Sequence, residues 1–110
     1  MKNLLLILML AAPLASAQQF ACPERLDNAR LLGGGMYHGH NKEYEMQGLH
    51  SKEPGGYNVH YGFTPTDVKW LVCGYEGRKE WWVRIEKSRA TDCRLTSRGK
   101  RKVSVKLKCK

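Results

Sequence analysis

The end of the chain decides the fold, because there the sequence reads Val103-Ser104-Val105-Lys106-Leu107-Lys108-Cys109-Lys110. Apolar and polar residues alternate strictly along this stretch, as they do in a strand with one buried face. The apolar face ends in a cysteine, and the opposite face is mostly lysine. The sequence therefore predicts a half-buried β-strand with a cationic outer side.

Three runs of similar pattern precede this strand. Residues 68–75 carry apolar groups on both faces, which predicts a central strand. Residues 76–80 read as a turn, and residues 81–86 complete a hairpin. Residues 91–96 form a third run, and turn residues follow at 97–100. Successive strands with short connections predict an antiparallel meander.

The first half of the chain is less regular. Residues 57–63 alternate well enough to form another strand. Asn41 is a candidate helix N-cap, and one or two helical turns are expected up to residue 49. The predicted fold is mainly β, with a small α+β fold as the alternative. We expect an antiparallel meander of four to six strands with at most one short helix, stapled by two disulfides.

The first seventeen residues have the organisation of a cleavable secretory signal peptide. Lys2 is followed by a Leu- and Ile-rich run, and small residues lead to Ala17. The apolar run is about a dozen residues long, whereas a membrane-spanning helix needs roughly 20. We therefore expect export, no membrane span, and one domain of residues 18–110.

All four cysteines fall within this expected domain. An even number of cysteines in an exported chain predicts a disulfide framework. Zinc ligation is disfavoured because no Cys-x-x-Cys pair is present. Four cysteines allow three pairings, and sequence alone leaves them open. Our prediction is a Cys22–Cys109 bridge and a Cys73–Cys93 bridge.

The charge is concentrated toward the end of the chain. The formal net charge is +9, and removing the segment that contains Lys2 lowers it by one, to +8. Lysines on the outer side of the last strand can have either of two roles. They can protect an exposed strand from aggregation, or they can dock an acidic partner. The partner-binding candidates are Lys100, Arg101, Lys102, Lys106, Lys108 and Lys110.

Three kinds of partner fit such a surface: a neutral or acidic protein, anionic lipid and nucleic acid. The basic stretch contains no aromatic residues on which bases stack, so nucleic acid is the weaker fit. Trp82 is added to the candidates because Trp81 and Trp82 must face opposite sides of a strand, and an exposed Trp is a typical binding hot spot. The alternative is that Trp82 packs under a loop.

No cofactor is predicted. His38 and His40 would point the same way on a strand and are weak candidate metal ligands, to which His50 or His60 could add a third, but a His-x-His pair is common by chance. We therefore predict no metal. The alternative to a binding protein is a small basic exported hydrolase or nuclease using His38, His40 or His60 with lysines. No catalytic signature motif supports it.

Several short segments together form a recognisable pattern: Cys22-Pro23-Glu24-Arg25-Leu26, residues 70–75, Cys93 and residues 105–109, with a looser match at 37–49. This pattern resembles that of a family of small periplasmic bacterial proteins of uncharacterised function. Its members begin with Cys-Pro after the signal peptide, carry a Trp-x-x-Cys-x-Tyr-like strand and end at a cysteine. The resemblance implies the periplasm of a Gram-negative bacterium and supplies no catalytic residues. The lysine-rich end of this chain departs from the pattern of that family.

The prediction from sequence is thus a non-catalytic periplasmic binding protein. An inhibitor or immunity protein against an effector or hydrolase is its most concrete form, because a rigid stapled domain binds at a small ordering cost. The partner is expected to be neutral or acidic, since two positive proteins repel.

Overall fold

The structure, a computed structural model, describes residues 18–85 and 89–110. The predicted signal peptide lies outside these residues. The described residues form ten strands and one 3-10 turn, η2 (Glu76–Arg78). The strands are β1 (Gln18–Ala21), β2 (Arg25–Leu26), β3 (Ala29–His38), β4 (Tyr44–Glu45), β5 (Leu49–Glu53), β6 (Gly56–Gly62), β7 (Lys69–Tyr75), β8 (Lys79–Ile85), β9 (Asp92–Arg98) and β10 (Ser104–Cys109).

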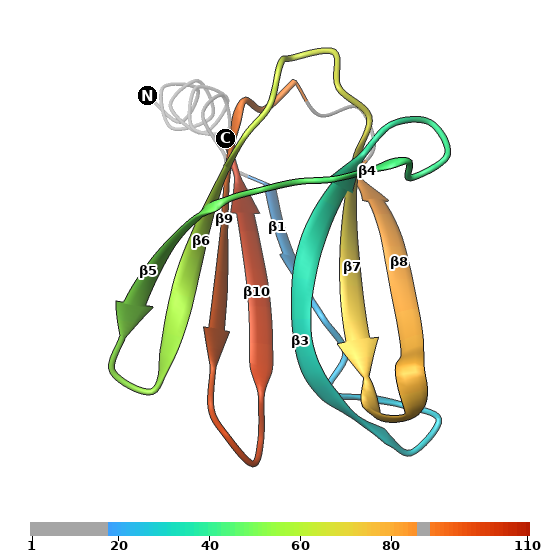
Figure 1. The fold of residues 1–110 in the computed structure, drawn as a ribbon, viewed down its shortest axis with the longest axis vertical. Coiled ribbons are helices and arrows are strands. Elements are labelled where there is room, and N and C mark those ends of the chain that lie inside the picture. The colour runs from blue at the N-terminus through green and yellow to red at the C-terminus, as the bar shows by residue number, and fades with distance from the viewer. Residues whose placement is uncertain (1–17, 86–88) are drawn as a thin grey trace, which may run out of the picture.

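The strands form two antiparallel sheets (Figure 1). The first sheet has the order β1-β10-β9-β6-β5, and the second has the order β2-β3-β7-β8 with β4 paired to β3. The mainly β, antiparallel prediction is confirmed. The chain nevertheless forms more strands than expected. It divides them between two sheets because the β7–β8 hairpin joins β3, through β7, and does not pair with β9. No helix in the described part of the chain is long and apolar enough to cross a membrane.

The helical turns expected at residues 41–49 do not form. Lys42 has a left-handed backbone with φ 60°, which interrupts a helix at its first turn. The backbone N–H of Met46 instead donates to the carbonyl oxygen of Met36 in β3, at 2.9 Å. Pairing with an existing strand satisfies this segment better than an isolated short helix, which is costly to nucleate.

One hydrophobic core lies between the two sheets. The first sheet contributes inward residues such as Leu95, Val105 and Leu107, and the second contributes Leu31 and Leu71, all of them buried. The strict alternation of residues 103–110 therefore has the predicted meaning: its apolar side faces this core.

The sheets approach closely at Gly34 in β3. A Cβ atom there would lie 3.0 Å from Cγ1 of Val105 in β10 and 3.1 Å from the carbonyl oxygen of Val72 in β7. Both distances are shorter than ordinary van der Waals contact. The Gly33-Gly34-Gly35 run thus allows β3 to pack against the first sheet.

The prediction of two disulfides is confirmed, but the predicted pairing of the four cysteines is wrong. Cys22 bonds to Cys73, and Cys93 bonds to Cys109. Cys93 and Cys109 are directly opposite each other in the β9–β10 pair, with Cα atoms 4.1 Å apart. This register leaves Cys109 out of reach for Cys22. The Cys22–Cys73 bridge instead connects the segment after β1 to the centre of β7, and so connects the two sheets.

Candidate binding surface

The outer side of the first sheet carries a group of cations from neighbouring strands. Lys106 and Lys108 of β10 are exposed, because their neighbours Val105, Leu107 and Cys109 face the core. Arg94 of β9 lies opposite Lys108 in the register and is also exposed. We call Arg94, Lys106 and Lys108 the cationic face.

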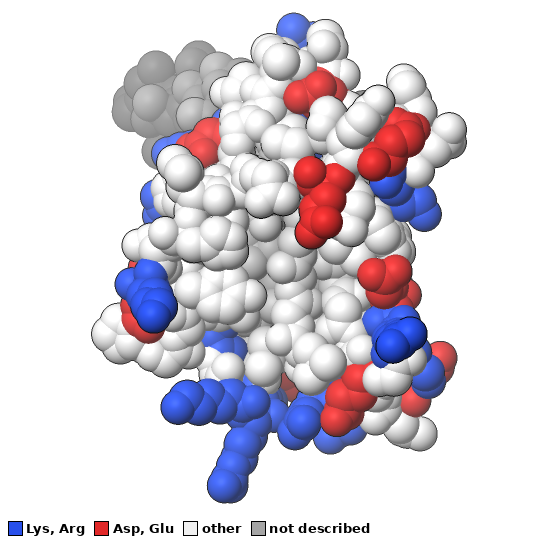
Figure 2. Space-filling view, viewed as in Figure 1, with Lys and Arg blue, Asp and Glu red and all other residues white. Residues whose placement is uncertain are grey.

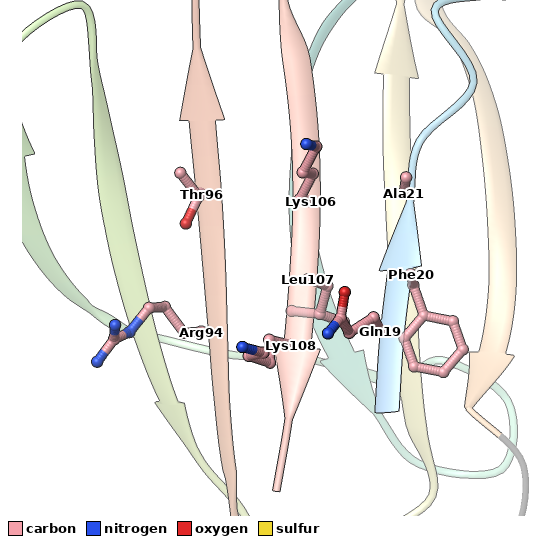
Figure 3. Close-up of a pocket in the computed structure, with 8 residues that line it drawn as sticks. All are labelled: Gln19, Phe20, Ala21, Arg94, Thr96, Lys106, Leu107 and Lys108. Carbon is pink, nitrogen blue, oxygen red and sulfur yellow. The ribbon is translucent and has the colours of Figure 1, made fainter. Parts of the chain in front are cut away.

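The cationic face borders a shallow groove (Figure 3). The groove forms where short side chains, Ala21 of β1 and Thr96 of β9, flank Lys106. Gln19 contributes an amide beside Lys108. The complete lining is Gln19, Phe20, Ala21, Arg94, Thr96, Lys106, Leu107 and Lys108. Such a groove offers several cationic and amide donors to an acidic ligand.

The cations of this face differ from other surface cations in their ion pairing. Within residues 18–85 and 89–110, no carboxylate lies within ion-pairing distance of Arg94, Lys106 or Lys108. Arg94 instead donates through Nε to Nε2 of His60 in β6, at 3.0 Å. The contrast is Arg98 on the same strand, which pairs with Glu53 at 2.6 Å. No described carboxylate therefore offsets the charge of the cationic face.

Three further predicted residues lie at the tip of the β9–β10 hairpin. Lys100, Arg101 and Lys102 are exposed in the turn, next to Gly99 with φ 97°. Figure 2 shows Lys and Arg side chains gathered at this end of the molecule, below a largely uncharged centre. Lys102 lies 3.7 Å from Glu24, an exposed pair of the kind that contributes little stability. Lys110 is exposed directly after β10, at the opposite end of the hairpin.

Trp82 is separated from the cationic face and lies on the second sheet. Its ring packs edge-on against Tyr37, with centroids 4.8 Å apart, and Lys42 Nζ lies 4.8 Å above it. Trp70 completes this aromatic cluster, and Lys42 lies 5.1 Å above that ring as well. Trp82 is therefore half-buried, whereas Trp81 is 37% exposed. The more exposed of the two tryptophans is the one that the sequence analysis did not select.

The histidines considered for metal do not converge. His38 stacks on Tyr44 with ring centroids 4.9 Å apart, and its Nδ1 lies 4.0 Å from Asp67. His40 follows Gly39, whose φ of 110° breaks the strand alternation that would align the two imidazoles. In the part of the chain that the structure describes, no three metal-binding side chains form a group.

A buried lysine lies near His38. Lys69 in β7 is fully buried, and its Nζ donates to the carbonyl oxygen of Asp67 at 3.1 Å and lies 5.5 Å from the ring centroid of Phe63. Burial lowers the pKa of Lys69, while the nearby Asp67 opposes this shift. Its tight enclosure makes Lys69 part of the packing at this end of the second sheet.

The fold and surface together define a two-sheet, disulfide-bonded β protein with one cationic sheet face. Comparison of the chain with protein-family models, curated proteins and solved structures found no match. The resemblance to small periplasmic proteins therefore stays a prediction.

The sequence analysis selected Lys106 and Lys108 for binding but missed Arg94, and it named His60 only as a candidate catalytic residue. The signal for Arg94 was available, because residues 91–96 were predicted as a strand next to the lysine-rich one. Its exact place depends on the β9–β10 register, which the disulfide-bonded pair Cys93 and Cys109 fixes.

Proposed function

We propose that this protein is an exported, non-catalytic binding protein that docks an acidic region of another protein on its cationic face. The observation that carries the proposal is the grouping of Arg94, Lys106 and Lys108 on adjacent strands with no described carboxylate in ion-pairing range. Like charges on neighbouring strands repel, so a negative partner that docks there relieves this repulsion as well as adding attraction of its own.

A protein partner is favoured over nucleic acid by the position of the aromatic residues. Single-stranded nucleic acid binding combines a positive groove with aromatic rings on which bases stack. Here Tyr37, Trp70 and Trp82 gather on the second sheet, whereas the cationic face lies on the first. Anionic lipid is disfavoured because a peripheral lipid-binding surface usually combines cations with several exposed apolar side chains. Of the four large apolar residues that are exposed in the described structure, one, Leu49 of β5, lies on the first sheet, two strands away from Arg94.

The form of binding that we favour is neutralisation of an effector or hydrolase in the periplasm. Two disulfides and paired strands hold the cationic face in place before binding. A preorganised surface loses little conformational entropy on association. Export is supported by the signal-peptide organisation of residues 1–17 and by the presence of both bridges, which persist in oxidising compartments.

The test is affinity capture from periplasmic extract with three forms of the oxidised protein as bait. The first is the wild type, the second is Lys106→Gln/Lys108→Gln, and the third is Lys52→Gln/Lys79→Gln, which loses the same charge elsewhere on the surface. We expect a partner that the first and third baits retain, the second loses, and salt releases. Equal retention by all three baits would contradict the proposal.

One observation favours the hydrolase or nuclease alternative. His60 faces the cationic side and bonds to Arg94, which places one titratable group beside cations suited to phosphate. Catalysis on a phosphodiester needs a second acid or base on the other side of the phosphorus, and His50 lies on the opposite face of the β5–β6 pair. Phosphodiester cleavage that is lost in His60→Ala would replace the binding proposal.

A further inference from the structure

The free edge of β8 is the longest unpaired strand edge of the described structure. β8 pairs with β7 on one side, and no described strand follows it (Figure 1). It has seven residues, compared with four in β1, five in β5 and two in β2, the other strands that end the sheets. Such an edge exposes a row of backbone N–H and C=O groups that can pair with another strand.

The composition of β8 protects this edge only at its first residue, Lys79. Natural proteins discourage pairing at an edge with short strands, lysines or prolines. β5 follows that rule, since Lys52 lies within it and Pro54 follows it directly. The centre of β8 is instead Trp81-Trp82-Val83, three residues with high strand propensity.

β8 carries one negative and one positive residue at equal distances from its central residue, Trp82. Glu80 and Arg84 lie two residues on either side of Trp82, so strand alternation places all three on the same side of the sheet. Both charged residues are exposed. An antiparallel copy of the same strand, centred on Trp82, would therefore place each charge opposite its counterpart.

We propose that β8 pairs antiparallel with β8 of a second copy of this chain, with Trp82 on the two-fold axis. Glu80 then lies opposite Arg84 of the second copy, and symmetry repeats this pair on the other side. Trp81 lies opposite Val83 of the second copy on the other side of the sheet. Opposite charges and aromatic–β-branched pairs are both favourable cross-strand neighbours. The result is one continuous sheet through both copies.

Neighbouring registers lack this match. Centring the pair on Trp81 places Glu80 opposite Trp82, and centring it on Val83 places Arg84 opposite Trp82. Each shift removes both ion pairs. The charge pattern therefore selects one register, and this surface is separate from the cationic face on the other sheet, so either proposal can fail without the other.

The test is sedimentation equilibrium of the oxidised protein, from about 10 μM to about 1 mM, because self-association depends on protomer concentration. We expect a monomer–dimer equilibrium. Glu80→Arg and Arg84→Glu each turn two favourable pairs into repulsive ones, so each weakens the dimer by about tenfold or more. The double variant Glu80→Arg/Arg84→Glu restores both pairs and the dimer. Lys52→Glu, a reversal on β5, leaves the dimer unchanged.

Three outcomes overturn the proposal: a wild type that stays monomeric throughout, single variants that dimerise as the wild type does, and a double variant that is not restored. Because a variant can fail to fold, hydrogen exchange of the wild type gives a second measurement. Amides of β8 are expected to exchange more slowly at high protein concentration than at low. Exchange of β8 that is independent of concentration contradicts the pairing.

Discussion

Gly56, the first residue of β6, occupies a position where no side chain fits. A Cβ atom there would overlap the carbonyl oxygen of Ser97 and lie 3.0 Å from Cα of Arg98, both in the backbone of β9. Backbone atoms held in a sheet cannot rotate away as a side chain can. Gly62 ends the same strand, and a Cβ atom there would have no atom within 4 Å.

We predict that Gly56→Ala lowers the free energy of unfolding by about 1–3 kcal/mol, the usual cost of forcing extra atoms into a packed site. Gly62→Ala is the control and changes it by at most about 0.5 kcal/mol, as exposed substitutions do. Urea unfolding of the oxidised proteins measures both. Equal stabilities of the two variants would show that β9 does not lie against Gly56 as described.

Tyr75 links alkaline pH to stability. Its side chain is buried, and its hydroxyl donates to the carbonyl oxygen of Pro23 at 2.6 Å. Burial raises the pKa of Tyr75 above its ordinary value of 10.0. Burial also raises the pKa of Tyr61. Because both folded-state pKa values exceed the unfolded ones, the stability they contribute is complete below pH 10.0 and is lost as the pH rises through the folded values.

We predict that an alkaline absorbance titration of tyrosinate shows a late component that appears together with unfolding. Tyr75→Phe removes part of that component and lowers the free energy of unfolding at neutral pH by about 1 kcal/mol, because one hydrogen bond is lost. Tyr44→Phe, at a side chain that is 58% exposed, is the control. A late component of unchanged size in Tyr75→Phe contradicts the assignment.

At the scale of elements, the β9–β10 hairpin organises the first sheet. Its register pairs Ser104 with Arg98 at the turn and Cys109 with Cys93 at the open end. The same register brings Arg94 opposite Lys108. The bridge that closes the hairpin therefore also holds the cationic face.

This hairpin shows what the sequence could and could not predict. Alternation in residues 103–110 predicted the strand, its buried side and its lysines, because a period of two depends only on local residues. The Cys93–Cys109 bridge could also have been predicted, since the two cysteines are equally distant in sequence from the centre of the turn. Pairing of β7 with β3 was not predictable, because the Gly33-Gly34-Gly35 run has no alternation of apolar and polar side chains, although it permits close packing of a strand. Neither local periodicity nor turn chemistry specifies which distant strand a central strand will select.

The two bridges constrain chain segments of different length, with separations of 51 residues for Cys22–Cys73 and 16 for Cys93–Cys109. Loop-closure entropy predicts that removing the longer bridge costs about 4 kcal/mol and removing the shorter about 3 kcal/mol. The paired variants Cys22→Ala/Cys73→Ala and Cys93→Ala/Cys109→Ala, unfolded in urea, measure this. We expect the first to be the less stable, because its bridge also connects the two sheets. The reverse order contradicts this account.

At the scale of the whole molecule, net charge and local charge can be separated by experiment. The formal charge of residues 18–110 is +8, the full +9 less Lys2, and it attracts any polyanion. Lys106→Gln/Lys108→Gln and Lys52→Gln/Lys79→Gln lower this charge equally. Any difference between these two variants therefore reports where the ligand docks.

With poly-L-glutamate as the probe, we predict that the association rate falls more in Lys106→Gln/Lys108→Gln than in Lys52→Gln/Lys79→Gln. Charges at a docking surface act mainly on the association rate and its salt dependence. The difference should disappear as salt shortens the screening length from about 10 Å at 0.1 M to about 3 Å at 1 M. Stopped-flow measurement across this range tests it. Identical rates for the two variants at low salt would mean that attraction comes from the total charge alone, and that the grouping on β9 and β10 does not direct binding.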